Sequence, residues 1–186
     1  MFEQITLLLS FVYALALTHL LSSTTDLILA RDRVRFSWTH ALWMLLALSV
    51  VFENWLSLRS LEGLKRWTLQ DEVLQFVAAV IQYFTCSLVS IKVPREGPVD
   101  MATSNTRQAP VFLTAFAATS VVLVIANYID RRPGGSGWIG PDLVDLAALG
   151  LIVLAATVKR RWVQILAPAS ILALMAGYLV ALMPSS

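Results

Sequence analysis

Six long apolar stretches, separated by short polar connections, constrain this chain more than any other feature of its sequence. Each has roughly the 20 residues that an α-helix needs to cross a hydrocarbon layer about 30 Å thick. Hydrophobic residues make up 58% of the 186 residues and charged residues only 14%, which is more apolar surface than a water-soluble fold can bury. The sequence therefore predicts an all-α integral membrane bundle of about six transmembrane helices, approximately residues 5–29, 37–58, 68–93, 110–129, 141–158 and 162–183.

The Lys and Arg residues predict which helix ends face the cytoplasm. Nine of them fall in the first, third and fifth connections, against five in the second and fourth. Because cytoplasmic connections carry an excess of basic residues, the sequence predicts that both termini lie outside. The larger set comprises Arg31, Arg33, Arg35, Lys92, Arg95, Arg107, Lys159, Arg160 and Arg161.

Three smaller features predict details of the bundle. The polar stretch 94–109 predicts a mobile cytoplasmic linker between two sets of three helices. Ala169, Ala173 and Gly177 recur every four residues in the last helix, which predicts either close packing inside the bundle, the interpretation we favour, or a subunit interface. Tryptophans at predicted helix ends indicate an aromatic belt at the membrane surfaces, formed by Trp38, Trp55, Trp67, Trp138 and Trp162.

A polar stripe on the first helix carries the main functional hypothesis. Each ionisable residue costs roughly 2.5–3.5 kcal/mol at the centre of a membrane helix, so its presence calls for a reason. His19, Ser22, Ser23 and Asp26 follow i, i+3, i+4, i+7 spacing and share one face of that helix. His40, just inside the second helix, should reach a similar depth to Asp26, so these two side chains could pair.

The same residues also allow a purely structural interpretation. Asp26 could form a salt bridge with Arg31 or Arg33 at the membrane surface. His40 could sit at the level of the lipid headgroups. His19 could remain neutral and hydrogen-bond to a carbonyl or to Gln82 in the middle of the third helix.

Two further helices contribute polar candidates. Glu53 lies near the outer end of the second helix, where it is either a vestibule ligand for protons or cations or an acid that faces the outer surface. Gln75, Gln82 and Cys86 align on one face of the third helix, where they favour hydrogen bonding between helices. If that face meets the stripe of the first helix, the interior would be polar enough to hold water.

Several classes of function are not indicated. The sequence lacks the HExxH, GxSxG and CxxC motifs and a Gly-rich phosphate loop, so we expect no catalytic, metal or cofactor site. Two histidines at different depths are poor paired ligands for a haem. A net charge of +2 does not favour nucleic acid. The expected partners are membrane lipids, with further copies of the chain or a larger membrane complex.

Basic and aromatic residues in the first half of the chain carry a family resemblance. They are Arg31, Arg33, Arg35, Trp38, His40, Trp43, Trp55, Trp67, Tyr83 and Pro94. In these residues the chain resembles small polytopic bacterial inner-membrane proteins of uncharacterised function. The resemblance implies a multi-pass location in the inner (cytoplasmic) membrane and no activity, and it assigns no functional residues.

The sequence therefore allows two alternative functions. The first is a channel or transporter component for protons or small cations, with a polar seam on the first three helices. The seam would comprise His19, Ser22, Ser23, Asp26, His40, Glu53 and Gln82. The second is a non-catalytic accessory or structural subunit of a larger membrane complex, in which the same residues hold helices together. We favour the first, because ionisable residues inside a membrane usually serve a function.

Overall fold

The computed structural model describes residues 2–58, 69–130 and 140–182, which form six long helices and little else. The helices are α1 (Phe2–Leu29), α2 (Trp38–Ser57), α3 (Leu69–Val89), α4 (Met101–Asp130), α5 (Gly140–Thr157) and α6 (Arg161–Leu182). By length and composition, five of them can cross a membrane, and the apolar part of α5, Leu143–Thr157, is shorter. The prediction of an all-α membrane bundle is confirmed.

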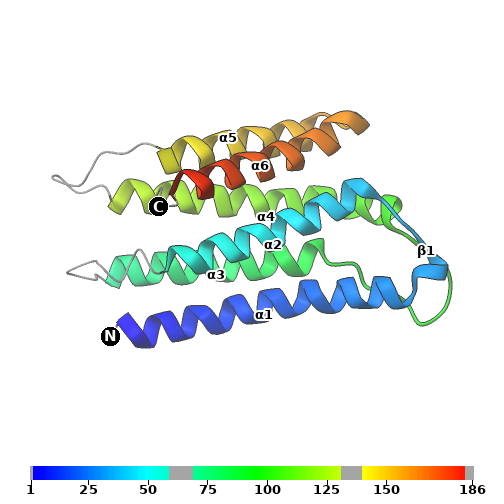
Figure 1. The fold of residues 1–186 in the computed structure, drawn as a ribbon, viewed down its shortest axis with the longest axis horizontal. Coiled ribbons are helices and arrows are strands. Elements are labelled where there is room, and N and C mark those ends of the chain that lie inside the picture. The colour runs from blue at the N-terminus through cyan, green and yellow to red at the C-terminus, as the bar shows by residue number, and fades with distance from the viewer. Residues whose placement is uncertain (1, 59–68, 131–139, 183–186) are drawn as a thin grey trace.

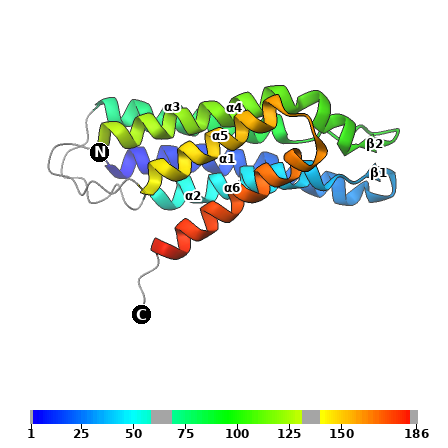
Figure 2. The same ribbon diagram turned by 90° about the horizontal axis from the view of Figure 1, so that it is seen from above.

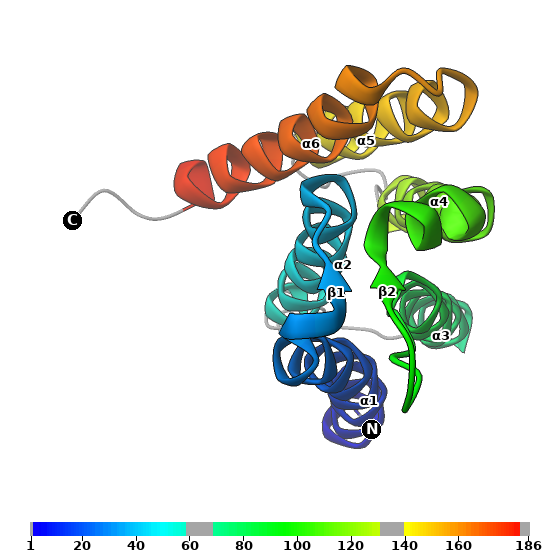
Figure 3. The same cartoon turned by 90° about the vertical axis from the view of Figure 1, so that its right-hand side faces the viewer.

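Helix α2 occupies the centre of the bundle. It packs against α1, α3, α4 and α6, while α5 packs against α4 and α6 on the side away from α1 (Figure 3). All six helices run along the long axis, and the first, third and fifth connections lie at the same end (Figure 1). That end carries the nine basic residues and is called the basic end below. The last turns of α6 lean away from the other helices (Figure 2).

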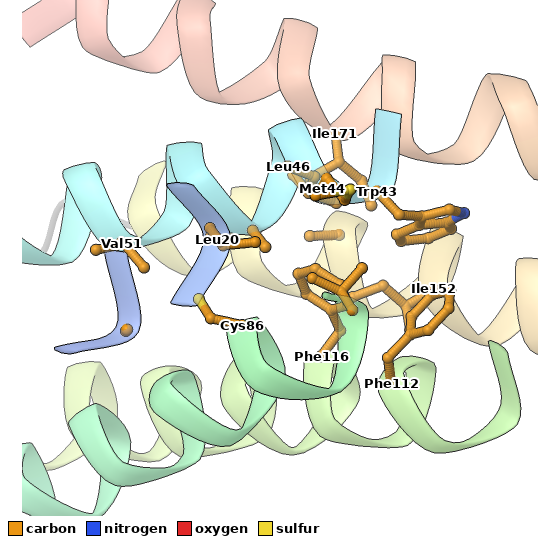
Figure 4. Packing of buried hydrophobic residues seen from close by; sticks show 14 of the residues in the cluster. Leu20, Trp43, Met44, Leu46, Val51, Cys86, Phe112, Phe116, Ile152 and Ile171 are labelled. Carbon is orange, nitrogen blue, oxygen red and sulfur yellow. The ribbon is translucent and has the colours of Figure 1, made fainter. Parts of the chain in front are cut away.

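An aromatic layer fills the centre of the bundle between α2 and α4. It consists of Trp43, Phe112 and Phe116, each at most 2% exposed. The ring centroid of Trp43 lies 5.8 Å from that of Phe112 and 5.5 Å from that of Phe116 (Figure 4). Since lipid tails are as apolar as these side chains, the layer stabilises the bundle through close packing and ring contacts and not through escape from water.

The connection 94–109, predicted to be a mobile linker, is shorter and more ordered than expected. Helix α4 already begins at Met101, and the preceding strand β2 (Val99–Asp100) pairs in parallel with β1 (Val34–Arg35). Arg33, in a short 3₁₀ turn, donates through Nη1 to the carbonyl oxygens of Pro94, Arg95 and Gly97 at 3.1–3.5 Å. These contacts hold the first and third connections together at the basic end.

Asp100 explains why α4 starts nine residues earlier than the apolar pattern suggested. One carboxylate oxygen accepts hydrogen bonds from the backbone N–H groups of Ala102 (2.8 Å) and Thr103 (3.3 Å), and the other lies 3.7 Å from Arg35 Nη1. Such a cap satisfies amide groups that are otherwise left open at the start of a helix. Polar residues after Asp100 therefore remain helical, and the sequence prediction wrongly placed them in a linker.

Helix α3 also ends earlier than predicted, at Val89 and not at residue 93. The Ser90 hydroxyl donates to the carbonyl of Cys86 at 2.7 Å, which is one of the last carbonyls of the helix. The next amide, that of Ile91, donates to Ser23 Oγ on α1 at 2.9 Å. A side chain of a neighbouring helix thus replaces the helical partner, which apolar periodicity alone cannot reveal.

The close packing inside the bundle that we favoured for the small residues of α6 is wrong for Ala173 and Gly177. Both are exposed, and a Cβ atom at Gly177 would meet nothing within 4 Å. The buried face of α6 carries Val163, Ala167, Ile171 and Met175 instead. Of the expected aromatic belt, Trp38, Trp55 and Trp162 lie exposed at helix ends, and Trp67 and Trp138 lie outside the described residues.

The cap on α4 predicts a pH-dependent stability. The backbone N–H of Thr103, together with that of Ala102 and with Arg35, holds the pKa of Asp100 below its usual range. A lowered folded-state pKa stabilises the fold above the unfolded value of about 4, and this contribution is lost as the pH falls through the folded value. In detergent, Asp100→Ala should therefore melt a few degrees below wild type near neutral pH, and the difference should shrink in acid.

Two controls accompany this melting experiment. Asp100→Asn retains a capping oxygen without the charge and should melt between wild type and Asp100→Ala. Asp32→Ala removes an acid of the same end whose side chain is 92% exposed, and it should change little. A difference in melting temperature between wild type and Asp100→Ala that stays constant down to low pH would contradict the role of the carboxylate.

Candidate functional site

The polar stripe of α1 is divided between the bundle and its surface. His19, Ser22 and Asp26 are exposed, whereas Ser23 is 6% exposed and donates to the carbonyl of Ile91 at 2.9 Å. His19 Nε2 lies 3.0 Å from the hydroxyl of Tyr83 on α3, so its partner is not Gln82. Asp26 forms no ion pair with a described residue. Within the part of the chain that the structure describes, three of the four stripe residues therefore face outward and do not line the interior of the bundle.

His40 is fully buried and joins three helices. Its Nε2 donates to the carbonyl of Val89 on α3 at 2.8 Å, and its Nδ1 lies 3.2 Å from Oδ1 of Asn105 on α4. The carbonyl can only accept, which fixes a proton on Nε2. The hypothetical pair with Asp26 is wrong, because both ring nitrogens of His40 face other groups. His40 and Asn105 are called the inner polar pair below.

Gln82 faces α2 and not the stripe of α1. Its Nε2 donates to the carbonyl of Ala47 at 3.3 Å and contacts Cys86 Sγ at 3.6 Å. Its Oε1 is buried without a hydrogen-bond partner among the described residues. One turn further along α3, the hydroxyl of Thr85 lies 3.5 Å from that of Thr119 on α4. Gln82 and Thr85 thus point into the α2–α4 side of the bundle, whereas Tyr83 faces α1.

Glu53 lies beside a second carboxyl group that the sequence alone does not place there. Glu53 on α2 and Asp145 on α5 line the same small cavity, of about 40 Å³, and are close enough for their charges to interact. Glu53 forms no hydrogen bond or ion pair with the residues that the structure describes. Because water holds a share of about 30 Å³ in the liquid, this cavity suits one or two waters or a small ion.

Ser120 on α4 completes this site, which is called the outer cavity below. Its neighbour Thr119 donates to the carbonyl of Ala115 at 3.1 Å, as hydroxyls in membrane helices commonly do. Ser120 is 7% exposed and lines the cavity, yet within residues 2–58, 69–130 and 140–182 its hydroxyl has no partner. A hydroxyl that faces a cavity in a membrane protein can be satisfied by a water or an ion bound there.

The aromatic layer separates the outer cavity from the inner polar pair. Phe116 lines the cavity, and the ring of Phe112 lies 6.1 Å from that of His40 on the opposite side. Between these two polar regions, the centre of the bundle is filled by Trp43 and the two Phe rings (Figure 4). The layer contains one buried polar atom, Trp43 Nε1, which has no hydrogen-bond partner among the described residues.

Sequence analysis found Glu53 and His40 but missed their partners. Asp145 and Ser120 were not among the candidate residues, and Asn105 fell within the predicted linker 94–109. Periodicity shows which residues share a face of one helix. It does not show which helix that face meets, so the partners of Glu53 and His40 required the three-dimensional arrangement.

The two histidines predict contrasting effects on stability. His40→Ala removes two buried contacts and leaves the Val89 carbonyl without its partner, so it should lower the free energy of unfolding by about 1–3 kcal/mol. His19→Ala removes one contact at an exposed position and should cost under about 1 kcal/mol. Unfolding in mixed micelles by increasing SDS measures both variants. Equal losses for the two would contradict the assigned difference in burial.

Comparisons of the chain with protein-family models, with curated proteins and with solved structures found no significant match. What the outer cavity and the inner polar pair can do is therefore inferred from their own geometry. The structure supports a polytopic membrane protein with a small acidic cavity on one side of a closed aromatic layer.

Proposed function

We propose that this protein is a channel or transporter component that binds a proton or a small monovalent cation in the outer cavity. The observation that carries the proposal is the meeting of Glu53, Asp145 and Ser120 in one cavity between α2, α4 and α5. The proposal keeps the role expected for Glu53. It moves the path from the stripe of α1 to the interior of the bundle.

Electrostatics favour a cation in this cavity. Two carboxylates close together in surroundings of low dielectric constant repel each other, and the repulsion is strong because little water screens it. A proton shared between Glu53 and Asp145, or a cation bound between them, removes the repulsion. Ser120 can offer its oxygen to such a cation, which gives its unpaired hydroxyl a partner.

The size and ligand set of the cavity favour a single charge. Glu53 and Asp145 supply at most two negative charges, and among the described residues no three His, Cys, Asp or Glu side chains gather as a multivalent metal site usually requires. Thr119 adds a hydroxyl beside Ser120. Oxygen ligands of this kind suit protons, Li⁺ or Na⁺ more than soft transition metals.

The aromatic layer acts as the closed gate of this proposal. An ion in the outer cavity meets Phe116 before it can reach the polar groups on the other side. Apolar constrictions close pores by excluding water. Opening requires α2 and α4 to move apart at Trp43 and Phe112, after which His40 and Asn105 are the next polar groups toward the basic end.

The orientation of the protein in the membrane is part of the same proposal. With the basic end in the cytoplasm, both termini and the outer cavity face the outside of a bacterial inner membrane. Passage would then run from the outer cavity to the cytoplasm.

A different observation favours the second candidate, an accessory subunit of a larger membrane complex. His19, Ser22 and Asp26 are exposed on α1, where lipid offers them no hydrogen bonds. A helix of a second copy or of another protein would supply partners for this face. Native purification distinguishes the two candidates, since an accessory subunit copurifies with unrelated chains in fixed ratio.

Ion flux into liposomes tests the proposed function. Wild type should carry protons, Na⁺ or Li⁺ above the rate of empty vesicles, measured with a pH-sensitive or cation-sensitive dye inside the vesicles. Glu53→Gln keeps the size of the side chain but removes its charge, and it should reduce flux at least about tenfold, a loss of about 1.4 kcal/mol. Phe116→Ala shortens the gate and should increase flux.

Asp26→Asn is the matched control for flux, because it removes an acid of α1 that lies outside the cavity. It should conduct like wild type. Flux no greater than that of empty vesicles for both wild type and Phe116→Ala would rule out the channel hypothesis. Loss of flux in Asp26→Asn with retention in Glu53→Gln would return the path to the stripe of α1.

A further inference from the structure

A groove between α1 and α2 opens onto the membrane at the basic end. It encloses about 410 Å³ and runs along α1 from Leu20 to Ile28, a distance of about 12 Å by helical rise. Its walls are apolar side chains that remain open to the membrane, such as Leu21 at 51% and Leu45 at 48% exposure. The shape and the lining suit a hydrocarbon chain.

One charged side chain lines this groove, and it stands at the mouth. Of the three arginines in the first connection, Arg33 is held by three carbonyl oxygens and Arg35 lies beside Asp100. Arg31 lines the groove and has only a weak contact with Asp32, at 3.9 Å, with its side chain 81% exposed. Its guanidinium is therefore available to an anion at the membrane surface.

Aromatic residues place this mouth at the level of the lipid headgroups. Phe36 lines the groove and packs edge-on against Trp38, with ring centroids 5.0 Å apart. Trp38 is 73% exposed, and tryptophans of this kind prefer the boundary between headgroups and acyl chains. A molecule with its anion on Arg31 would thus place its apolar part in the groove.

A second groove gives room for a long chain. It encloses about 760 Å³ between α1, α2 and α6, at the place where α6 leans away from the bundle (Figure 2). Leu48 lines both grooves, so they meet on the surface of α2. An acyl chain that enters beside Arg31 can continue past Leu48 toward the opposite side of the membrane.

We infer that this groove binds an anionic phospholipid, with its phosphate on Arg31 and one acyl chain between α1 and α2. Basic pockets between membrane helices at the cytoplasmic side are a recognised kind of site for anionic headgroups. A planar guanidinium can donate two hydrogen bonds to a phosphate. This inference is independent of ion passage through the outer cavity.

Native mass spectrometry of the delipidated protein tests the inference, with phosphatidylglycerol and phosphatidylcholine added separately. Wild type should retain phosphatidylglycerol in preference to phosphatidylcholine. Arg31→Gln should reduce phosphatidylglycerol binding about fivefold, the effect expected of one basic residue at a membrane surface, and leave phosphatidylcholine unchanged. Arg160→Gln removes another exposed arginine of the same end and should bind like wild type.

A variant that fills the groove tests the acyl chain separately. Ala41 lines the groove, so Ala41→Phe should weaken binding of both lipids while the protein still elutes as a folded species from size exclusion. Equal binding of the two lipids by wild type would overturn the inference, as would equal losses in Arg31→Gln and Arg160→Gln. Binding of glycerol phosphate as tight as that of the whole lipid, or a groove covered by a second copy of the chain, would also overturn it.

Discussion

Polar groups inside this bundle must find their hydrogen-bond partners within the protein, because hydrocarbon offers them none. Ser23 binds both the carbonyl and the amide of Ile91 just after the end of α3, and His40 binds the carbonyl of Val89, the last residue of that helix. Gln82 reaches the carbonyl of Ala47 across the α2–α3 contact. These bonds fix how α1, α2 and α3 are placed relative to each other, and the aromatic layer then fixes α4 against α2.

The outer cavity brings two carboxyl groups together. Glu53 and Ser120 have no hydrogen-bond partner within the described part of the chain. Buried atoms without a partner occur elsewhere too, at Trp43 Nε1, Asn54 Nδ2, Glu72 Oε1, Gln82 Oε1 and Gln108 Oε1, but none of these groups lines the cavity with a second acid beside it. Keeping an unpaired carboxyl and hydroxyl beside Asp145 lowers stability. In the proposed function, a bound proton or cation offsets this cost by supplying the missing contacts.

The sequence predicted the class of fold and most helix bounds, because apolar runs of membrane length are an unambiguous signal. It placed the four residues of the α1 stripe on one face, but only Ser23 is buried. Neighbouring residues on a helix point about 100° apart, so Ser22 is exposed although Ser23 is not. Glu53 was identified as an acid of α2, but the polar side chains that share its cavity come from α4 and α5. Contacts between distant segments depend on packing that no local pattern encodes, and the same holds for Asn105 beside His40.

Infrared difference spectroscopy of the protein in lipid tests the central claim most directly, because it observes the carboxyl group itself. Spectra are recorded for wild type and Glu53→Gln as Na⁺ or Li⁺ is added and as the proton concentration is varied, and carboxyl changes shared by the two proteins are subtracted, because the other acids titrate in both. We predict that a carboxyl band specific to wild type changes on binding. The absence of any carboxyl change specific to wild type under every condition would contradict the account.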